Sequence, residues 1–379
     1  MTDATARFQA FLDLVPGPGQ IPDWDGIEAL LGPRAAAMAA CPQDPHHHGE
    51  GDVLTHTRMV VSALIADPDW AARPQERQAG LFWAAVLHDI GKPATTRTEE
   101  DGRITSRGHS RTGAAIAREL LWHAGAPFAW REEICGLIAS HQLPFWLIER
   151  DNSARMAIET SLTCNTADLV LHARADARGR ICADGEDLLT RIDLAQALFE
   201  EEACFGTARA FANDGSRIEW VAREDRDPTY AVHEDYGCTV TMMSALPGSG
   251  KDTWISRHMP GTPVVSLDAI REELGIKPTD NQGRVIQEAR ERARVHLRAG
   301  EDFIWNATNI TRQIRTPILS LFRDYGARTR IVYIEAEPDR LKTQNAGRAA
   351  AVPGKVIASL AGKLEPPTLL EAHEITFVV

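Results

Sequence analysis

The sequence lacks the features that mark membrane, secreted and repeat-containing proteins. No apolar run approaches the roughly 20 residues that a membrane-spanning helix requires. The N-terminal segment MTDATARFQAF lacks the basic-then-apolar pattern of a signal peptide. The six cysteines form no C-x-x-C pair and no disulfide-like spacing, and neither an internal repeat nor a low-complexity tract is visible. We therefore expect a cytoplasmic protein in a reducing compartment, with no membrane partner.

The charge of the chain is unevenly distributed. Hydrophobic residues make up 44% and charged residues 25% of the 379 residues, ordinary values for a chain long enough to form two domains. The net charge is −12, but residues 237–379 carry +3 and residues 1–236 carry −15. The acidic part is a poor general surface for nucleic acid and a good one for cations. The mildly basic part could bind the end of a polyanion but not coat its length.

A glycine-rich segment in the second half has the pattern of a phosphate-binding loop. Residues 242–254 read MMSALPGSGKDTW, with a predicted buried strand at residues 238–241 before them and a predicted helix after them. Such an arrangement binds nucleotide phosphates because backbone N–H groups, the helix N-terminus and the lysine converge on them. We expect ATP or another NTP, with Mg²⁺, to contact Pro247, Gly248, Ser249, Gly250, Lys251, Asp252 and Thr253.

Two residues depart from the usual G-x-x-x-x-G-K-[ST] pattern. Ala245 stands where the first glycine is usual, and Asp252 stands where a serine or threonine would hold magnesium. A carboxylate beside a triphosphate is repulsive unless a cation lies between them. Asp252 is therefore expected to bind magnesium directly or through water. The alternative is a decayed loop, or a Gly/Ser turn that only resembles one.

Apolar runs alternate with helical patterns after this loop. Strands are predicted at residues 263–267, 302–305, 330–334 and 374–378, and helices at residues 282–299, 314–325 and 355–362. This alternation predicts an α/β domain whose parallel sheet has helices on both faces. Ligands bind at the carboxyl ends of the strands in such sheets.

Polar segments stand near the expected carboxyl ends: residues 268–271 (DAIR), 306–309 (NATN) and 344–348 (QNAGR). With the phosphate loop, they resemble the 5′-OH polynucleotide kinase family of P-loop phosphotransferases, over about residues 238–379. The resemblance implies that Asp268 accepts the proton of the 5′-hydroxyl and that Arg271 holds a phosphate of the acceptor strand. A lid arginine of that family stabilises the transferred phosphoryl group, which corresponds to Arg348.

The same resemblance makes Lys251 a catalytic residue. Asn306 and Asn309 are expected to contact the substrate, although Asn306 occupies a position that is Asp in some members of the family. Arg312 and Arg315 are further candidates for substrate binding. For this pair we favour the simpler interpretation, a solvated position on a helix.

The first half of the chain contains histidine and aspartate residues at predicted helix ends. The apolar run at residues 81–87 predicts a buried helix, which Gly91 and Pro93 stop directly after His88 and Asp89. Further helices, predicted to begin near residues 46, 108, 132 and 162, carry or end on His56, His109, His141 and Asp176. Imidazoles and carboxylates that converge from several helices are suitable ligands for a transition metal such as Mn, Co, Ni, Zn or Fe.

This pattern resembles the HD metal-dependent phosphohydrolase superfamily, over roughly residues 45–205. The segments HGEGDVLTHT and RADARGR also resemble the HD domains attached to tRNA nucleotidyltransferases. The resemblance implies a first metal held by His56, His88, Asp89 and Asp176, and a second held by His109 and His141. Without the last two histidines, the site would bind one metal.

Two residues of this pattern have expected roles beyond single-metal ligation. Asp89 has two oxygens and is the natural bridge between two ions, and Lys92 could offset the charge of a bound phosphate. Other histidines are more simply explained as capping or core residues, a reading that we favour for His46, His47, His123 and His172.

We therefore predict an all-α HD domain at residues 1–206, a linker at residues 207–236 and a P-loop kinase domain at residues 237–379. The fusion resembles the HD-Pnk enzymes, bifunctional bacterial enzymes of nucleic-acid end healing. That resemblance implies hydrolysis of 2′,3′-cyclic phosphate or 2′/3′-phosphate ends by the first domain and phosphorylation of 5′-OH ends by the second. RNA or DNA ends would be the substrates, and a separate ligase would use the products.

Two other interpretations remain open. One is a small-molecule or nucleotide kinase fused to an HD nucleotide phosphohydrolase. The other is a nucleotide-sensing protein whose HD half only binds, although the intact His88–Asp89 pair and Asp268 argue against it. The sequence leaves the metal, the choice between RNA and DNA, the NTP and the oligomeric state undetermined.

Overall fold

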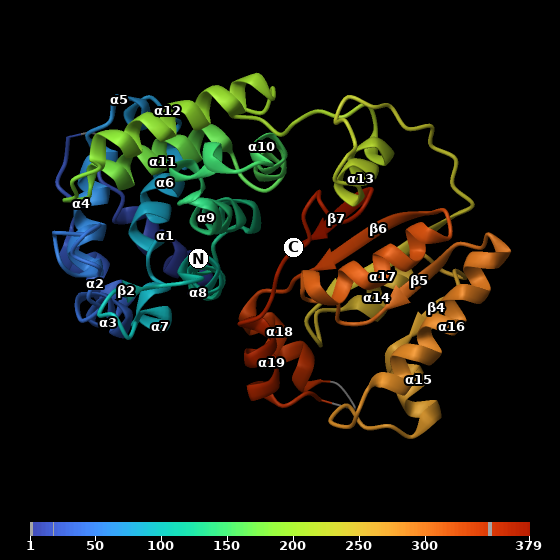
Figure 1. Ribbon diagram of the computed structural model, residues 1–379. Coiled ribbons are helices and arrows are strands. Elements are labelled where there is room, and N and C mark those ends of the chain that lie inside the picture. Colours follow the sequence, from blue (N-terminus) through green and yellow to red (C-terminus); the bar gives the residue numbers. More distant parts are fainter. Residues whose placement is uncertain (1–2, 18, 348–350) are drawn as a thin grey trace. The chain divides into compact units, whose positions relative to one another are not determined.

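The computed structural model describes residues 3–17, 19–347 and 351–379 (Figure 1). The chain forms two compact units, residues 1–210 and residues 211–379. The first is helical and the second contains a parallel sheet, so the predicted fold class is confirmed. Among the described helices, none combines the length and the apolar character needed to cross a bilayer.

The first unit is a bundle of helices with one small hairpin. Its helices are α1 (Asp3–Asp13), α2 (Trp24–Leu31), α3 (Pro33–Ala39), α4 (Val53–Ile65), α5 (Pro68–Ala71), α6 (Gln75–Leu87), α7 (Lys92–Thr95), α8 (His109–Ala124), α9 (Phe128–Ser140), α10 (Ser153–Ser161), α11 (Thr166–Arg178) and α12 (Gly185–Glu201). Strands β1 (Arg97–Thr98) and β2 (Ile104–Thr105) pair antiparallel, and short 3₁₀ turns occupy Leu143–Phe145 and Leu147–Glu149.

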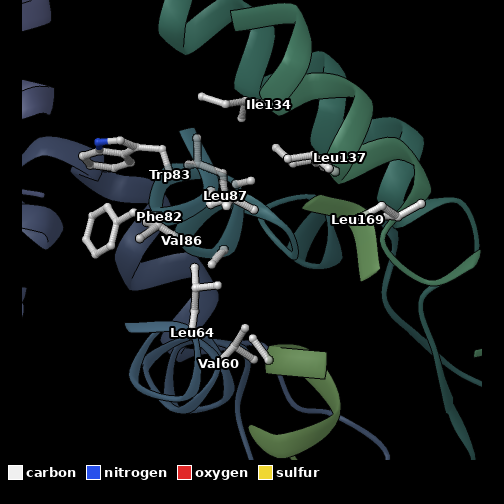
Figure 2. Close-up of a cluster of buried hydrophobic side chains, with 14 of the residues drawn as sticks. Val60, Leu64, Phe82, Trp83, Val86, Leu87, Ile134, Leu137 and Leu169 are labelled. Atoms are coloured by element: carbon white, nitrogen blue, oxygen red, sulfur yellow. The ribbon is translucent and has the colours of Figure 1, made fainter. Parts of the chain in front are cut away.

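Helix α6 is the centre of this unit. Its residues from Ala79 to Leu87 are all buried, which is typical of a helix surrounded by others. Figure 2 shows its Phe82, Trp83, Val86 and Leu87 among side chains of the neighbouring helices, namely Val60, Leu64, Ile134, Leu137 and Leu169. Because α6 ends at Leu87, the residues that follow it, His88 and Asp89, lie at the buried centre of the unit.

A close backbone contact positions the turn after α6. A Cβ added to Gly91 would lie 2.2 Å from the His109 carbonyl oxygen and 2.5 Å from the Gly113 nitrogen, so only glycine fits. This contact brings the turn against the first residues of α8. The helix predicted to begin near residue 46 instead begins at Val53, where the Asp52 side chain accepts a hydrogen bond from the Thr55 amide and caps it.

The second unit is built on a five-stranded parallel sheet of order β4-β5-β3-β6-β7. Its strands are β3 (Cys238–Ala245), β4 (Val264–Ser266), β5 (Phe303–Asn306), β6 (Ala327–Ile334) and β7 (Glu374–Val378). Its helices are α13 (Asp214–Ala222), α14 (Lys251–His258), α15 (Leu267–Leu274), α16 (Gly283–Ala299), α17 (Arg312–Asp324), α18 (Pro338–Ala346) and α19 (Gly354–Ala361).

Alternate residues of the central strand β3 pack into different cores. Met242 joins a cluster that includes residues of α16 and α17, whereas Met243 joins one that includes Ile255 of α14. Helices therefore cover both faces of the sheet, as the alternation of strands and helices predicts. The carboxyl ends of β3, β4 and β5 lie side by side, because Ser266 of β4 pairs with Asn306 at the end of β5.

The structure differs from the expected linker at residues 207–236. Residues from 211 onward belong to the second unit, and α13 packs within it. Arg217 of α13, 8% exposed, donates to the backbone carbonyls of Leu369, Ala372 and His373, at 2.9, 3.1 and 2.8 Å. The sequence predicted a linker here, but an arginine that donates to three backbone carbonyls is part of a folded core.

A second arginine is also buried against expectation. Arg315 on α17 is fully buried, and it donates to both carboxylate oxygens of Glu371, at 2.7 and 2.9 Å. It also donates to the carbonyls of Asn309 and Glu365. The solvated position that we favoured for Arg315 is therefore wrong, because its helical spacing did not reveal the distant Glu371. Arg312 is exposed.

The packing of α13 can be tested by substitution of Arg217. Arg217→Met removes the donor for three carbonyls near the end of the chain, and we expect the free energy of unfolding of the second unit to fall by about 2–4 kcal/mol. Arg223→Met, at a side chain that is 58% exposed near the end of the same helix, should change it by less than about 0.5 kcal/mol. Urea denaturation of both variants measures the difference. A similar stability for the two would contradict the assignment of α13 to the folded unit.

Candidate metal centre and phosphate loop

Six predicted metal ligands of the first unit converge in its interior. His56 comes from α4, Asp176 from α11, and His109 begins α8, whereas His88 and His141 directly follow α6 and α9. All six of these residues, Asp89 included, are at most 5% exposed. Two groups have their ligand atoms within 4.8 Å of one another: His56, His88 and Asp176, and Asp89, His109 and His141.

Asp89 lies between the two groups and contacts histidines of both. Its Oδ2 is 3.1 Å from His88 Nε2 and 3.8 Å from His56 Nε2. Its Oδ1 is 3.3 Å from His109 Nε2 and 3.8 Å from His141 Nε2. One carboxylate oxygen therefore faces each group, the arrangement expected of a residue that bridges two cations.

Backbone carbonyls orient four of the histidines. The Nδ1 atoms of His88, His109 and His141 lie 2.7–2.8 Å from the carbonyl oxygens three residues before each of them, and His56 Nδ1 lies 3.2 Å from the Gly179 carbonyl. A carbonyl can only accept, so it favours the proton on Nδ1 and leaves the Nε2 lone pair directed at the centre of the cluster. This is the tautomer that a metal ligand requires.

Supporting residues surround these ligands, and sequence reasoning did not identify them. Glu50 places Oε1 2.8 Å from Nδ1 of both His48 and His56, and its other oxygen accepts the Ile181 amide. Arg180 donates to both oxygens of Asp176, at 2.9 Å each. The HGEGDVLTHT and RADARGR segments contain these residues, but nothing local in the sequence shows that Glu50 meets residue 181.

Burial and neighbouring charges set the protonation of the cluster. Burial alone would raise the pKa of Asp89, but Lys92 and the nearby histidines hold that pKa well below its ordinary value. Burial would likewise raise the pKa of Asp176, yet Arg180 and His56 keep it well below the usual range. Burial lowers the pKa of both His109 and His141. Two carboxylates are thus ionised beside neutral imidazoles.

His56 is the exception within this cluster. Burial alone would lower its pKa, but the adjacent carboxylates of Asp176 and Glu50 raise that pKa above the ordinary histidine value. A proton on His56 thus offsets part of the negative charge when no other cation does so. A metal that binds Nε2 must displace this proton.

The residues of the cluster fit a divalent transition metal. Three buried atoms, His56 Nε2, His88 Nε2 and Asp89 Oδ1, have no hydrogen-bond partner among the described residues. Buried polar atoms are rarely left without partners unless a bound group uses them. The donors are mostly imidazole with carboxylate oxygen, a set that suits Mn, Fe, Co, Ni or Zn better than Mg.

A cavity of about 320 Å³ lies beside the cluster. His109 and Lys92 are in its wall, together with residues that include Gln43, His48, Arg180 and the segment 106–108. Lys92 Nζ is 2.7 Å from Asp89 Oδ2 and 2.5 Å from Gln43 Oε1, so this buried lysine links the cluster to the cavity. The expected role of Lys92 beside a phosphate remains a prediction.

Four histidines are predicted to be capping or core residues and not metal ligands, namely His46, His47, His123 and His172. His46 and His47 lie in a turn, and His123 is near the end of α8. His172 is fully buried, with its ring 5.5 Å from that of His88 and 6.0 Å from that of His141. It therefore lies against the metal cluster rather than in a distant part of the core.

The phosphate loop of the second unit connects β3 to α14. Gly248 and Gly250 have φ values of 88° and 98°, which side-chain-bearing residues rarely adopt. Gly250 precedes Lys251, the buried first residue of α14, and no side chain caps the N-terminus of this helix. Backbone N–H groups and the positive end of the helix dipole are thus available to phosphate oxygens.

Residues at the neighbouring strand ends complete this edge of the sheet. Asp268 lies in the first turn of α15, directly after β4, with a side chain that is 73% exposed. Arg271, one turn later, pairs with Asp268 and donates from Nε to Gln282 Oε1 at 2.8 Å. The structure thus brings Asp268 and Arg271 together at the carboxyl edge.

Asp252 and Asn306 interact directly. Asn306 Nδ2, at the end of β5, donates to Asp252 Oδ1 at 2.8 Å, while Asn306 Oδ1 is buried and has no hydrogen-bond partner among the described residues. The loop pattern places a hydroxyl at residue 252, and some kinases of the resembled family have a carboxylate at residue 306. In this chain the carboxylate stands at residue 252 and an amide at residue 306. Both offer an oxygen, which is the ligand type that Mg²⁺ requires.

Two further residues of the predicted kinase site are Asn309 and Arg348. Asn309 is 3% exposed, its φ is 45°, and its Nδ2 donates to the Met243 carbonyl at 2.7 Å. Its amide therefore connects the loop after β5 to β3, and a contact of Asn309 with the substrate stays a prediction. Arg348 lies outside the described residues. The preceding Asn345 exchanges two hydrogen bonds with the backbone of Val352.

Comparison with known families agrees with these folds. Residues 53–176 match a family model described as HD domain, and residues 240–367 match one described as AAA domain. The chain thus has a helical HD domain followed by a P-loop kinase-like domain with a five-stranded parallel sheet. The first implies a divalent metal, and the second implies a nucleotide with Mg²⁺.

Several curated proteins are similar in sequence to part of this chain. A "Multifunctional CCA protein" of Halorhodospira halophila is 33% identical over 209 residues, which are 53% of this chain and 47% of the relative. An "A-adding tRNA nucleotidyltransferase" of Deinococcus radiodurans is 35% identical over 41% of this chain and 34% of the relative. A "CC-adding tRNA nucleotidyltransferase" of Thermus thermophilus is 38% identical over 31% and 25%. The chain spans about half or less of the length of these relatives.

Solved structures of two kinases also match. A gluconokinase from Sinorhizobium meliloti has 17% identity and a TM-score of 0.28, over 38% of this chain and 85% of that one. A sugar kinase from Janibacter sp. has 18% identity and a TM-score of 0.29, over 37% and 85%. These TM-scores are too low to support an inference about substrate.

Metal binding to the first unit should be selective and pH-dependent. We expect Mn²⁺, Co²⁺, Ni²⁺ or Zn²⁺ to bind more tightly than Mg²⁺, and Asp89→Asn to weaken binding because it removes the charge between the two groups. Affinity should fall as the pH drops from 8 to 6, since His56, whose pKa is raised, must lose its proton to bind. Titration calorimetry with elemental analysis measures both effects. Equal affinity for Mg²⁺, or affinity independent of pH, would contradict the imidazole ligand set.

The carboxylate at residue 252 and the amide at residue 306 lead to a second prediction. Asp252→Ala should lower phosphoryl transfer by about 10²-fold, because it removes a fixed magnesium ligand, while Asp252→Ser retains more activity. Adding Asn306→Asp to Asp252→Ser returns the carboxylate to the other position and should restore activity further. Magnesium titrations of the kinase reaction compare the variants. Wild-type activity in Asp252→Ala would show that Thr253 or water supplies the ligand.

Proposed function

We propose that this chain is a bifunctional enzyme that heals the ends of broken nucleic acids. Its HD domain hydrolyses 2′,3′-cyclic phosphate or 2′/3′-phosphate ends, and its kinase domain transfers the γ-phosphate of an NTP to 5′-OH ends. The first reaction would open or remove a phosphate ester at a 3′ end, and the second would form a phosphate ester at a 5′ end, so the products would be suited to a separate ligase. This is the reaction pair of the HD-Pnk enzymes that the sequence resembles.

The position of Asp89 is the observation that carries the proposal. It contacts both groups of metal-ligand candidates through different oxygens, and it is 1% exposed. A site that only sensed nucleotides would need no buried carboxylate between two groups of imidazoles. Burying these charged groups costs free energy. That cost is explained if the groups bind metal ions that act on a phosphate ester.

In the first unit, the substrate phosphate would enter the cavity at Lys92 and His109. The six ligands would hold divalent cations, and these would supply Lewis acidity for the phosphoryl oxygens and the attacking water. Lys92, held by Asp89 and Gln43, places a positive charge in the cavity wall for the phosphate. Glu50 and Arg180 keep His56 and Asp176 in their orientations, and the buried setting limits bulk water.

In the second unit, the phosphate loop would hold the β- and γ-phosphates of the NTP. Lys251 neutralises charge on them, and the oxygens of Asp252 and Asn306 would hold Mg²⁺. Asp268 accepts the proton of the 5′-hydroxyl, and its 73% exposed side chain is accessible to a strand end. Arg271 pairs with Asp268 and holds the acceptor phosphate. Arg348 would stabilise the transferred group.

The curated relatives support a nucleic-acid substrate. Two of them are named as tRNA nucleotidyltransferases, whose names indicate that they act on a nucleic acid. The acidic composition of residues 1–236 also suits an enzyme that accepts an end and repels the rest of a strand.

Two sets of substitutions should separate the activities. Lys251→Ala or Asp268→Ala should lower 5′ phosphorylation by about 10²-fold or more, because they remove the phosphate contact or the base, and should leave hydrolysis of cyclic phosphate intact. His88→Ala or Asp89→Ala should do the reverse, with Asp89→Ala the more severe. Labelled oligonucleotides with 5′-OH and 2′,3′-cyclic phosphate ends report both reactions.

Exposed aspartates provide matched controls for this experiment. Asp324→Ala in the second unit and Asp187→Ala in the first should leave both activities unchanged. Circular dichroism checks folding, since His88 and Asp89 are buried. A folded Asp89→Ala protein that also loses kinase activity would refute the separation of the two reactions. Stimulation of ATP hydrolysis by a small molecule, and not by a 5′-OH oligonucleotide, would favour a small-molecule kinase instead.

A further inference from the structure

The cavity beside the metal cluster has a positively charged wall in an acidic part of the chain. Lys92, Arg107 and Arg180 line it, against one carboxylate, that of Asp44. Both oxygens of Asp44 are already engaged, since Oδ1 accepts the His46 amide and Oδ2 accepts the Ile104 amide. Residues 1–236 carry a net charge of −15, so this cavity is a local exception to its surroundings. A positive cavity in a negative surface concentrates anions at one point.

Arg107 differs from the other two cations of the wall. Lys92 is paired with Asp89, and Arg180 is paired with Asp176 through two hydrogen bonds. Arg107 is exposed, and no ion pair joins it to any residue that the structure describes. Its charge is therefore available to a ligand at the mouth of the cavity. Gly108, the next residue in the wall, precedes the uncapped N-terminus of α8, which adds partial positive charge.

The position of Arg107 relative to the cluster is set by the chain itself. It stands two positions before His109 in the sequence, and His109 Nε2 is 3.3 Å from Asp89 Oδ1. Two residues span at most about 7 Å, so the Arg107 backbone lies roughly one nucleotide away from a phosphate at the cluster. The cavity volume of about 320 Å³ is at the low end for ligand sites, which leaves room for one terminal nucleotide. The rest of a strand must leave through the mouth.

We infer that Arg107 binds the backbone phosphodiester that connects the 3′-terminal nucleotide of a nucleic-acid strand to the nucleotide before it. The inference rests on the proposed function of the first unit and adds to it a subsite for a second phosphate. A mononucleotide has no phosphate at this position and gains nothing from Arg107. An arginine suits the role because its planar guanidinium can donate two parallel hydrogen bonds to a phosphate. Arg107 thus selects strand ends over free nucleotides.

The test compares two substrates of different length. Wild-type protein, Arg107→Ala, Arg107→Lys and Arg103→Ala are assayed with a 2′,3′-cyclic mononucleotide and with an RNA trinucleotide that ends in a 2′,3′-cyclic phosphate. Arg103 lies in the nearby hairpin turn, pairs with Asp101 and is absent from the cavity wall, so its variant controls for the loss of one positive charge. Salt dependence is measured for each protein.

Arg107→Ala should raise the ratio of trinucleotide KM to mononucleotide KM about tenfold, because one charge-assisted contact is lost. The trinucleotide kcat should remain close to the wild-type value, and Arg107→Lys should recover part of the KM. The salt dependence of the trinucleotide KM should weaken by about 0.7 in the logarithmic slope. Arg103→Ala should change neither ratio nor slope.

Two kinetic outcomes would overturn the inference. An unchanged ratio in Arg107→Ala would mean that no second phosphate is bound there. Equal increases in KM for both substrates would place Arg107 at the reacting phosphate instead. If the wild-type protein hydrolyses neither substrate, the proposed function is wrong. A binding measurement then tests the phosphate subsite at Arg107 independently of hydrolysis. Fluorescence anisotropy with a 5′-labelled oligonucleotide bearing a 3′-phosphate should then give weaker binding for Arg107→Ala than for Arg103→Ala, and equal Kd values would refute the subsite.

Discussion

A buried carboxylate among histidines is the interaction on which the first unit depends. Burial alone would raise the pKa of Asp89, but the Lys92 ammonium, 2.7 Å from its carboxylate, and the nearby histidines hold that pKa well below its ordinary value. The fold serves this arrangement: an apolar helix carries Asp89 to the centre, and a glycine lets the next turn approach α8. Carbonyls on the far side of each histidine then direct the Nε2 atoms inward. Such a cluster is expensive to bury, and its cost is explained if cations and a phosphate ester use it.

The second unit also gathers groups that can bind phosphate and a cation, but on a parallel sheet instead of a helical bundle. A parallel sheet places the phosphate loop, Asp268 and Asn306 at adjacent strand ends, where N–H groups and oxygens can meet a nucleotide and its cation. The carboxylate at Asp252 and the amide at Asn306 keep one negative charge in the pair. A carboxylate at residue 252 instead of residue 306 still offers oxygen ligands to Mg²⁺, although it departs from the usual sequence pattern of the loop.

The features predicted correctly from sequence are those with local signals. Alternating apolar runs indicated the parallel sheet, and the helix stop at Gly91 placed His88 and Asp89 at a buried helix end. The structure brings together all six proposed metal ligands. The errors concern contacts between distant segments. Arg217 lies in the segment predicted to be a linker, and Arg315 was expected to be solvated on a helix. Each is instead buried against groups that no local pattern reveals. Glu50 escaped notice for the same reason.

In the proposed function, one chain acts on both kinds of end that a strand break leaves. The most direct measurement uses an RNA oligonucleotide with a 5′-OH and a 2′,3′-cyclic phosphate, incubated with ATP, Mg²⁺ and Mn²⁺ and analysed by mass spectrometry. We predict a product that has gained a phosphoryl group at its 5′ end and has had its cyclic phosphate opened or removed. An oligonucleotide unchanged at both ends, under conditions in which the protein hydrolyses free nucleotides or phosphorylates a small molecule, would contradict the account.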